Sequence, residues 1–155
     1  MIEALAVLIG EWDVESNKLG VRGRATIDPF EGDRFVRLRS GEDNGEMPTS
    51  TWIIGGDDST DHCTSLYYDS RNVRRVYQMS VQDGVWTIWR DAPNFNQRYV
   101  GKIMDGGKTI TGQWEISKDG KSWEVDFDLT LPQSSVASTA TSRLRLKTRS
   151  RICAA

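Results

Sequence analysis

Short hydrophobic and β-branched runs alternate with turn residues about every ten positions along this chain. Such runs span residues 11–16, 23–28, 34–40, 49–55, 63–70, 74–81, 85–90, 97–104, 109–117 and 122–131. The dipeptides Asp83-Gly84 and Asp119-Gly120 favour tight hairpin turns, because both types of residue tolerate positive φ. The pattern therefore predicts an all-β antiparallel meander of about ten strands, with only a short helix over residues 2–9.

The last run, residues 122–131, shows the clearest alternation. Its apolar positions lie on one predicted face and are Trp123, Val125, Phe127, Leu129 and Leu131. Asp126 and Asp128 fall on the opposite, wet face. Several middle runs are apolar or aromatic on both faces, so their inward side is left open. Closing ten short strands into a barrel hides their edges and leaves an interior that can hold a small ligand.

The 155 residues suit one domain with a sizeable core. We expect residues 1–132 to form the barrel and residues 133–155 to form a basic, disordered tail. That tail begins with a Ser-, Thr- and Ala-rich stretch and then carries five Lys and Arg but no acid. All 22 acidic residues therefore belong to the barrel, which argues against a nucleic-acid groove on it.

Several classes of protein lack support in the sequence. No apolar run approaches the roughly 18 residues of a spanning helix, and no signal peptide is evident, so a cytoplasmic location is expected. The two cysteines, Cys63 and Cys153, lack the spacing of zinc or dithiol motifs. No phosphate-binding glycine loop or GxSxG motif occurs. We expect neither a metal nor a cofactor.

Gly10-Glu11-Trp12 at the start of the first strand resembles the Gly-x-Trp motif of the calycin superfamily, which includes lipocalins and fatty-acid-binding proteins. The stretches YYDSRNVRRVYQMS, WRDAPNFNQRYVG and GQWEISKDGKSWEVDFDLT are most similar to small bacterial calycin-like domains of unassigned function. The resemblance covers roughly residues 8–131 and implies that Trp12 plugs the closed end of a barrel. Fatty-acid-binding proteins carry an Arg-x-Tyr pair on their last strand, whereas here Arg75 and Tyr77 belong to the sixth run.

Arginines and tyrosines supply the candidate polar contacts. Arg75 and Tyr77 point to one side of their strand, because side-chain direction repeats every two residues, and inward they would hold an anionic or carbonyl oxygen. Outward, they would be an ordinary surface arginine and a filling tyrosine. Arg90 and Arg98 flank a turn and would either anchor a ligand at the barrel mouth or be neutralised by Asp91, Glu115 or Asp69.

These observations favour binding of a small, largely hydrophobic molecule inside the barrel with an Arg/Tyr polar anchor. The candidate ligand-binding residues are Tyr68, Arg75, Tyr77, Trp89, Arg90, Arg98 and Trp114. One alternative is a cofactor-free isomerase, cyclase or hydrolase on the same barrel, with His62, the only histidine, or an inward carboxylate as its base. Haem binding and a structural barrel filled by side chains are further alternatives. The expected partner is a small hydrophobic molecule, and homodimerisation is left open.

Overall fold

The computed structural model describes residues 2–42 and 47–135. A 3-10 helix, η1 (Ile2–Leu8), precedes ten strands. The strands are β1 (Gly10–Ser16), β2 (Val21–Phe30), β3 (Phe35–Glu42), β4 (Ser50–Gly56), β5 (Cys63–Asp69), β6 (Arg74–Gln82), β7 (Val85–Arg90), β8 (Asn96–Met104), β9 (Thr109–Ser117) and β10 (Glu124–Pro132). A second short 3-10 turn, η2 (Asp105–Gly107), joins β8 to β9. These bounds agree with the predicted runs to within a few residues, and the short N-terminal helix is confirmed.

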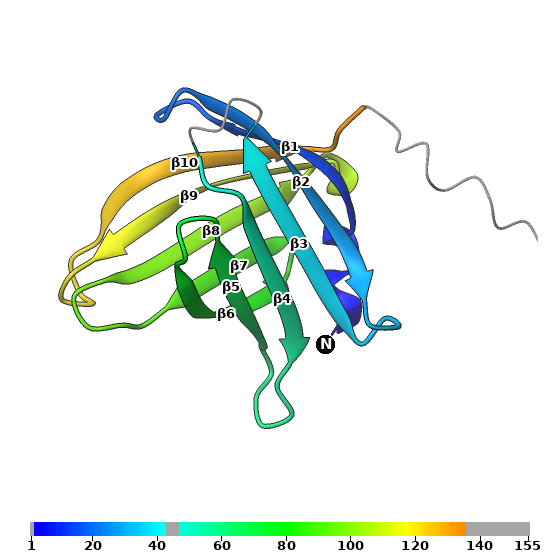
Figure 1. Cartoon of the computed structure of the whole chain (residues 1–155), viewed down its shortest axis with the longest axis horizontal. Coiled ribbons are helices and arrows are strands. Elements are labelled where there is room, and N and C mark those ends of the chain that lie inside the picture. Colours follow the sequence, from blue (N-terminus) through cyan, green and yellow to red (C-terminus); the bar gives the residue numbers. More distant parts are fainter. Residues whose placement is uncertain (1, 43–46, 136–155) are drawn as a thin grey trace, which may run out of the picture.

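The strands close into an antiparallel barrel in which each strand pairs with its neighbours in sequence (Figure 1). Closure joins β1 to β10, where Glu15 lies opposite Thr130, while β1 pairs with β2 through Trp12 and Ala25. The predicted fold class, an all-β meander closed into a barrel, is therefore confirmed. Because every strand has two partners, no strand edge is left exposed to pair with another chain.

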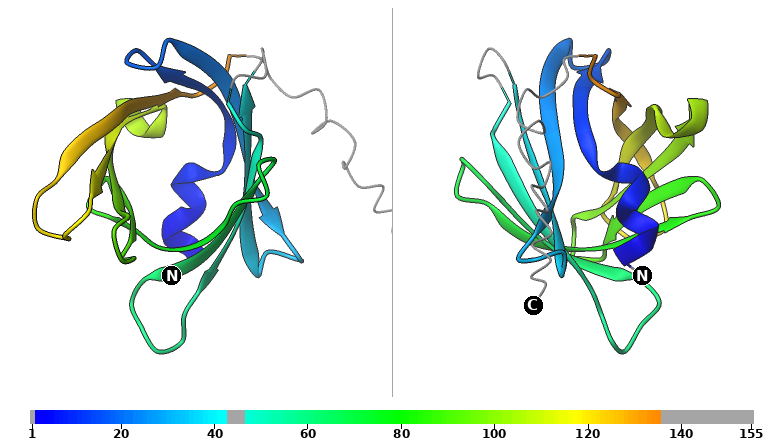
Figure 2. Two further views of the ribbon diagram at one scale, coloured as in Figure 1. Left: turned by 60° about the vertical axis from the view of Figure 1, so that its left-hand side comes forward. Right: turned by 90° about the vertical axis from the view of Figure 1, so that its right-hand side faces the viewer.

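The N-terminal helix η1 lies across one end of the barrel, which we call the closed end (Figure 2). Its residues Leu5 and Leu8 are buried, and Trp12 Nε1 donates a hydrogen bond of 2.8 Å to the carbonyl oxygen of Leu8. Trp12 is 1% exposed, which agrees with the plugging role that the calycin resemblance implies. The superfamily assignment itself stays a prediction.

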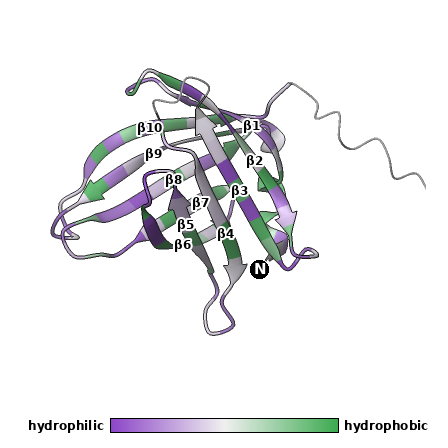
Figure 3. Ribbon diagram, viewed as in Figure 1, coloured by the Kyte–Doolittle hydropathy of each residue, from purple (hydrophilic) through white to green (hydrophobic). Residues whose placement is uncertain are grey.

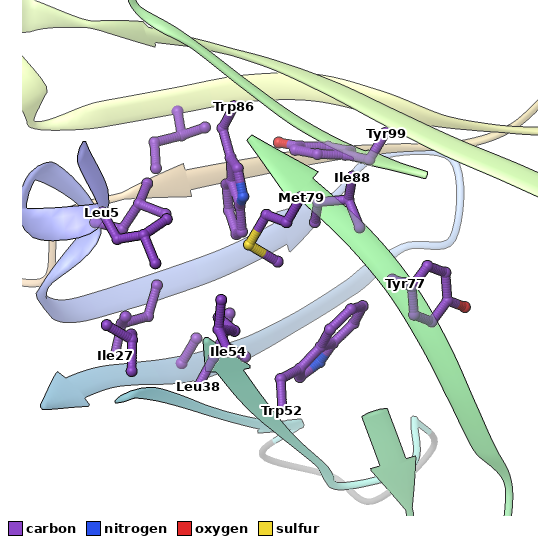
Figure 4. Packing of buried hydrophobic residues seen from close by; sticks show 14 of the residues in the cluster. Leu5, Ile27, Leu38, Trp52, Ile54, Tyr77, Met79, Trp86, Ile88 and Tyr99 are labelled. Atoms are coloured by element: carbon purple, nitrogen blue, oxygen red, sulfur yellow. The ribbon is translucent and has the colours of Figure 1, made fainter. Parts of the chain in front are cut away.

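The most deeply buried side chains gather in the half of the barrel next to η1. Ile27, Ile54, Met79 and Ile110 are each at most 1% exposed and lie toward the closed-end termini of their strands. Hydrophobic and hydrophilic positions alternate along many of the strands (Figure 3). The buried members of these strands are mostly apolar and pack into one core. Figure 4 shows Leu5 at one end of this cluster and Tyr77 at the other, with the Tyr77 hydroxyl directed away from Leu5. The opposite end, where Tyr77 lies, is the open end.

The alternation predicted along the last strand is wrong at its beginning. A register shift, a β-bulge, separates Val125 from Phe127: Val125 lies opposite Glu115, and Phe127 lies opposite the next residue back, Trp114. An extra residue on one strand reverses the side-chain direction that follows. Val125 is consequently exposed, whereas Asp126 lines the barrel interior.

The barrel pairing continues slightly beyond β10. Gln133 forms an isolated bridge with Trp12, and its backbone N–H donates to the carbonyl oxygen of Lys108. The backbone N–H of Ser134 donates to Glu11. Most of the predicted tail, residues 136–155, lies outside the described residues. Within the described part, no helix has the length and apolar character needed to cross a membrane.

Candidate functional site

A cavity of about 350 Å³ occupies the open half of the barrel. Six aromatic side chains form much of its wall, namely Trp52, Tyr67, Tyr77, Trp86, Tyr99 and Trp114. Their rings pack against one another; the Trp52 and Tyr77 centroids, for example, are 5.0 Å apart. Such a volume lies at the lower end of the range for small-molecule pockets, about 300–1,000 Å³. The cavity is therefore large enough for a small molecule.

Arg75, Tyr77 and Gln97 form a polar cluster on one wall of the cavity. Tyr77 Oη donates a hydrogen bond of 2.7 Å to Gln97 Oε1. Arg75 Nη1 donates to the same oxygen at 3.2 Å and to Tyr77 Oη at 3.4 Å. The guanidinium also lies over the ring of Phe95, 4.9 Å from its centroid. Residues of β6, of β8 and of the turn before β8 thus hold one arginine in place through neutral groups and an aromatic face, with β7 lying between the two strands.

The groups of this cluster that can still form hydrogen bonds with a ligand are mainly donors. Burial raises the pKa of Tyr77, and the opposing effect of Arg75 is smaller, so the phenol stays protonated and donates to Gln97. An arginine only donates, which identifies the Gln97 atom facing it as oxygen, so the other polar group of this side chain is its NH2, a donor. Trp86 Nε1, on the cavity wall, is buried without a partner in the described part of the chain. The cavity therefore favours a ligand that supplies acceptors.

A second polar cluster links the wall to the β5–β6 turn. Tyr67 Oη donates to Asp69 Oδ2 at 2.5 Å, and Arg71 Nη2 donates to the same oxygen at 2.7 Å. The Arg71 hydrogen bonds, reinforced by Tyr67 and the backbone N–H groups of Arg71 and Val73, hold the pKa of Asp69 well below its usual range. Desolvation raises the pKa of Tyr67. The charge of Arg71 is thus neutralised, and this cluster fixes the turn at the cavity mouth.

The structure brings three of the predicted site residues together on the cavity: Arg75, Tyr77 and Trp114. Arg90, at the end of β7, contacts the carbonyl oxygen of Phe95 at 3.4 Å and lies in an outer groove beside the mouth. Whether these four residues bind a ligand stays a prediction.

The other three candidates do not line the cavity. Tyr68 is exposed on the outside of β5, and Trp89 packs on His62 with the ring centroids 5.2 Å apart. Arg98 pairs with Glu115 and stacks on Trp123, 4.1 Å from its ring centroid. Neutralisation by Glu115 was one of the two interpretations offered for Arg98.

Sequence reasoning missed Gln97, Tyr67, Trp52 and Arg71 as cavity residues. The signal for Gln97 was its spacing, since it precedes the buried Tyr99 by two positions in one strand. Tyr67 and Tyr68 are adjacent aromatics, and only the barrel decides that Tyr67 faces inward. Arg71 belongs to a turn, where alternation carries no information.

The structure offers little of the catalytic apparatus considered above. His62 is not among the cavity-lining residues, so the barrel interior has no histidine to act as a base or as a haem ligand. Among the described residues, Asp126 is the one carboxylate on the lining. Among the described residues no three His, Cys, Asp or Glu side chains come together as a metal site. Cys63 is buried, and burial raises the pKa of its thiol.

Comparison with known proteins adds no assignment: no family model matches the chain, and no curated protein is significantly similar to it in sequence. The closed ten-stranded antiparallel barrel is compatible with a calycin-like barrel.

Proposed function

We propose that this protein binds a small, largely hydrophobic molecule inside the barrel, with Arg75, Tyr77 and Gln97 as its polar contacts. The observation that carries the proposal is the cavity itself, about 350 Å³ of space walled by aromatic rings in an otherwise closely packed barrel. Unfilled apolar space lowers stability, because the side chains around it lose contacts. A ligand with an apolar body restores those contacts and gains from leaving water.

The polar contacts give the ligand its orientation. The Arg75 guanidinium and the Gln97 amide offer hydrogen-bond donors at one side of an apolar pocket, which is the usual arrangement of specific small-molecule sites. A carbonyl, carboxylate or similar acceptor would face these donors while the rest of the molecule lies against Trp52, Trp114 and their neighbours. We propose a binding protein in preference to an enzyme, since the aromatic walls and the Arg75 cluster supply contacts for a bound molecule, and Asp126 is the one carboxylate that the described residues place on the lining. The cytoplasmic location stays a prediction.

The test is to fill the cavity and compare the result with an equal change outside it. Val14 lines the cavity, whereas Val100 is 43% exposed on the outer face. Isothermal titration calorimetry with 2-(2-naphthyl)ethanol, a neutral bicyclic probe, should show binding to the unmodified protein and to Val100→Phe. Val14→Phe should bind at least about tenfold more weakly, because the added ring occupies the pocket.

A second blocking variant protects the test against misfolding. Ser40 also lines the cavity, and Ser40→Leu adds volume on a different strand. Each variant should keep its circular dichroism spectrum and a cooperative thermal transition. Native mass spectrometry of freshly purified protein should also reveal a retained small molecule. The proposal fails if no molecule is retained and the probe does not bind, or if folded Val14→Phe and Ser40→Leu bind it as well as Val100→Phe does.

A further inference from the structure

Three arginines gather at the rim of the barrel, beside the open end of the cavity. Arg74, Arg75 and Arg90 all line an outer groove of about 550 Å³ between β6, β7 and the turn after β7. Arg75 lines both this groove and the cavity, so the two spaces meet at its side chain. The groove also has apolar walls, which include Leu66, Val76 and Trp89.

None of these three arginines forms an ion pair within the described ranges 2–42 and 47–135. Arg74 contacts Asn72 Oδ1 at 3.4 Å, Arg90 contacts the Phe95 carbonyl oxygen at 3.4 Å, and Arg75 contacts Tyr77 and Gln97. By contrast, Arg37, Arg71 and Arg98 pair with Asp28, Asp69 and Glu115. Other described arginines also lack an ion pair, but these three lie together on one groove, so their positive charges add there.

Two of the three charges converge on one point. Phe95 joins them, since Arg75 lies over its ring and Arg90 donates to its carbonyl oxygen. Arg90 is also the register partner of Gln97, which carries the Arg75 contact. Three carboxylates belong to this region, namely Asp126 on the cavity lining, Asp91 on the groove and Asp69, which pairs with Arg71. Within the described residues none of the three forms an ion pair with Arg75 or Arg90.

We propose that the ligand is an amphiphilic anion: its apolar body fills the cavity, and an oxyanion head group lies at the rim between Arg75 and Arg90. This inference rests on the binding function proposed above and names the chemical class of the ligand. Guanidinium groups hold carboxylate, sulfonate or phosphate oxygens through charge-assisted hydrogen bonds. The head group remains next to water, so its charge is not buried in the aromatic interior, which would be costly. Arg74 adds long-range attraction from the groove.

A matched series of probes isolates the head group. We would titrate 2-naphthaleneacetate, 2-(2-naphthyl)ethanol and 2-(2-naphthyl)ethylamine, which share one apolar body and carry a negative, a neutral and a positive group at neutral pH. The acetate should bind at least about tenfold more tightly than the alcohol, and the amine should bind most weakly. Raising the ionic strength should weaken the acetate alone, since screening acts on the charge pairing. 2-Naphthyl phosphate and 2-naphthalenesulfonate then identify the preferred oxyanion.

Arginine variants locate the contact. Arg75→Gln should weaken binding of the acetate much more than binding of the alcohol and so remove most of the preference for acetate, and Arg75→Lys should retain part of the preference because it keeps the charge. Arg90→Gln should give a smaller loss. The matched control is Arg37→Gln, since Arg37 stacks on Phe30 as Arg75 stacks on Phe95 but faces outward on β3 and is neutralised by Asp28. Arg37→Gln should leave the affinities for the acetate, the alcohol and the amine unchanged.

The outcomes separate the two proposals. If acetate and alcohol bind equally, and Val14→Phe weakens both, the cavity binds ligands but the oxyanion inference is wrong. The inference is also wrong if folded Arg75→Gln keeps the full preference for acetate. If no member of the series binds, both the proposed function and the inference fail.

Discussion

The two ends of the barrel are built by different kinds of interaction. At the closed end, η1 and the strand termini around it bury Leu5, Leu8, Trp12 and Met79 almost completely. At the open end, carboxylates hold three turns: Asp69 caps the β5–β6 turn, Asp119 the β9–β10 turn and Asp128 the β1–β2 turn. One carboxylate, Asp57, caps a turn at the closed end, between β4 and β5. Apolar side chains fill the barrel interior at the closed end, whereas a carboxylate that caps a turn holds the turn without filling the interior beneath it. The difference places the cavity and its polar groups at the same end.

The largest effect should come from removing apolar volume at the closed end. Leu5→Ala should lower the free energy of unfolding by about 2–5 kcal/mol, because Leu5 is 1% exposed and contacts atoms on every side. Leu38→Ala is the matched change beside the cavity and should cost less, since Leu38 already faces unfilled space. Urea unfolding of both variants measures the difference. If both variants lost the same free energy of unfolding, the proposed difference in packing between the closed end and the open half would be wrong.

A smaller loss of stability should follow from Asp69→Asn. The amide cannot accept hydrogen bonds with the strength of the carboxylate that serves Tyr67 and Arg71, so we expect a loss of about 1–3 kcal/mol. The same substitution should weaken probe binding, because the β5–β6 turn borders the cavity mouth. The control is Asp28→Asn, which also removes the carboxylate of an arginine ion pair but lies toward the closed end. Denaturant unfolding and probe titration are carried out on both variants. Asp28→Asn should leave probe affinity unchanged.

Acid should loosen the open end more than the closed end, because among the described residues three carboxylates with a lowered pKa hold turns there, against one, Asp57, beside η1. Hydrogen bonds from Arg71 lower the pKa of Asp69, backbone N–H groups of Ser122 and Lys121 lower that of Asp119 to about 2, and Lys18 and Asn17 lower that of Asp128. Each carboxylate therefore stabilises the fold above its unfolded pKa, near 3.9, and loses that contribution as the pH falls through its folded value.

Hydrogen exchange between pH 5 and pH 2 measures this loosening. Amide protection should fall first in residues 17–20, 70–73 and 118–122, and later in β1 and η1. Uniform loss of protection along the barrel would show that the two ends unfold as one unit. If amide protection were lost first at η1, the closed end would be the more sensitive of the two ends to acid.

The smallest change in stability should come from Phe95→Ala. Phe95 is 37% exposed, so truncation should lower the free energy of unfolding by less than about 1 kcal/mol. Affinity for 2-naphthaleneacetate should nevertheless fall several-fold, because the ring supports the Arg75 guanidinium. Thermal unfolding and calorimetry on one preparation give both quantities. Phe35→Ala, which truncates a ring of similar exposure toward the closed end, should leave the affinity intact.

Local patterning was sufficient to predict the strands but not the site. Each run between turn residues became a strand, since period-two alternation and the Asp-Gly turns act over only a few residues. The inward side of β5 could not be read in this way, because Tyr67 and Tyr68 are chemically alike and only Tyr67 is on the cavity. The alternation along the sequence also did not predict the β10 bulge. This bulge is the reason that Asp126 faces inward although strict alternation puts it on the wet face.

The amino-acid sequence by itself determined the all-β meander, the positions of its turns, the short N-terminal helix and the pairing of Arg75 with Tyr77 on one side of a strand. Only the tertiary structure decided which face of each strand turned inward, which arginines met a carboxylate, and where unfilled space remained. Strand formation depends on neighbours in sequence, so it is visible in local patterns. Cavity volume and charge neutralisation depend on residues from distant strands, such as Arg75 and Gln97, which meet only when the barrel closes.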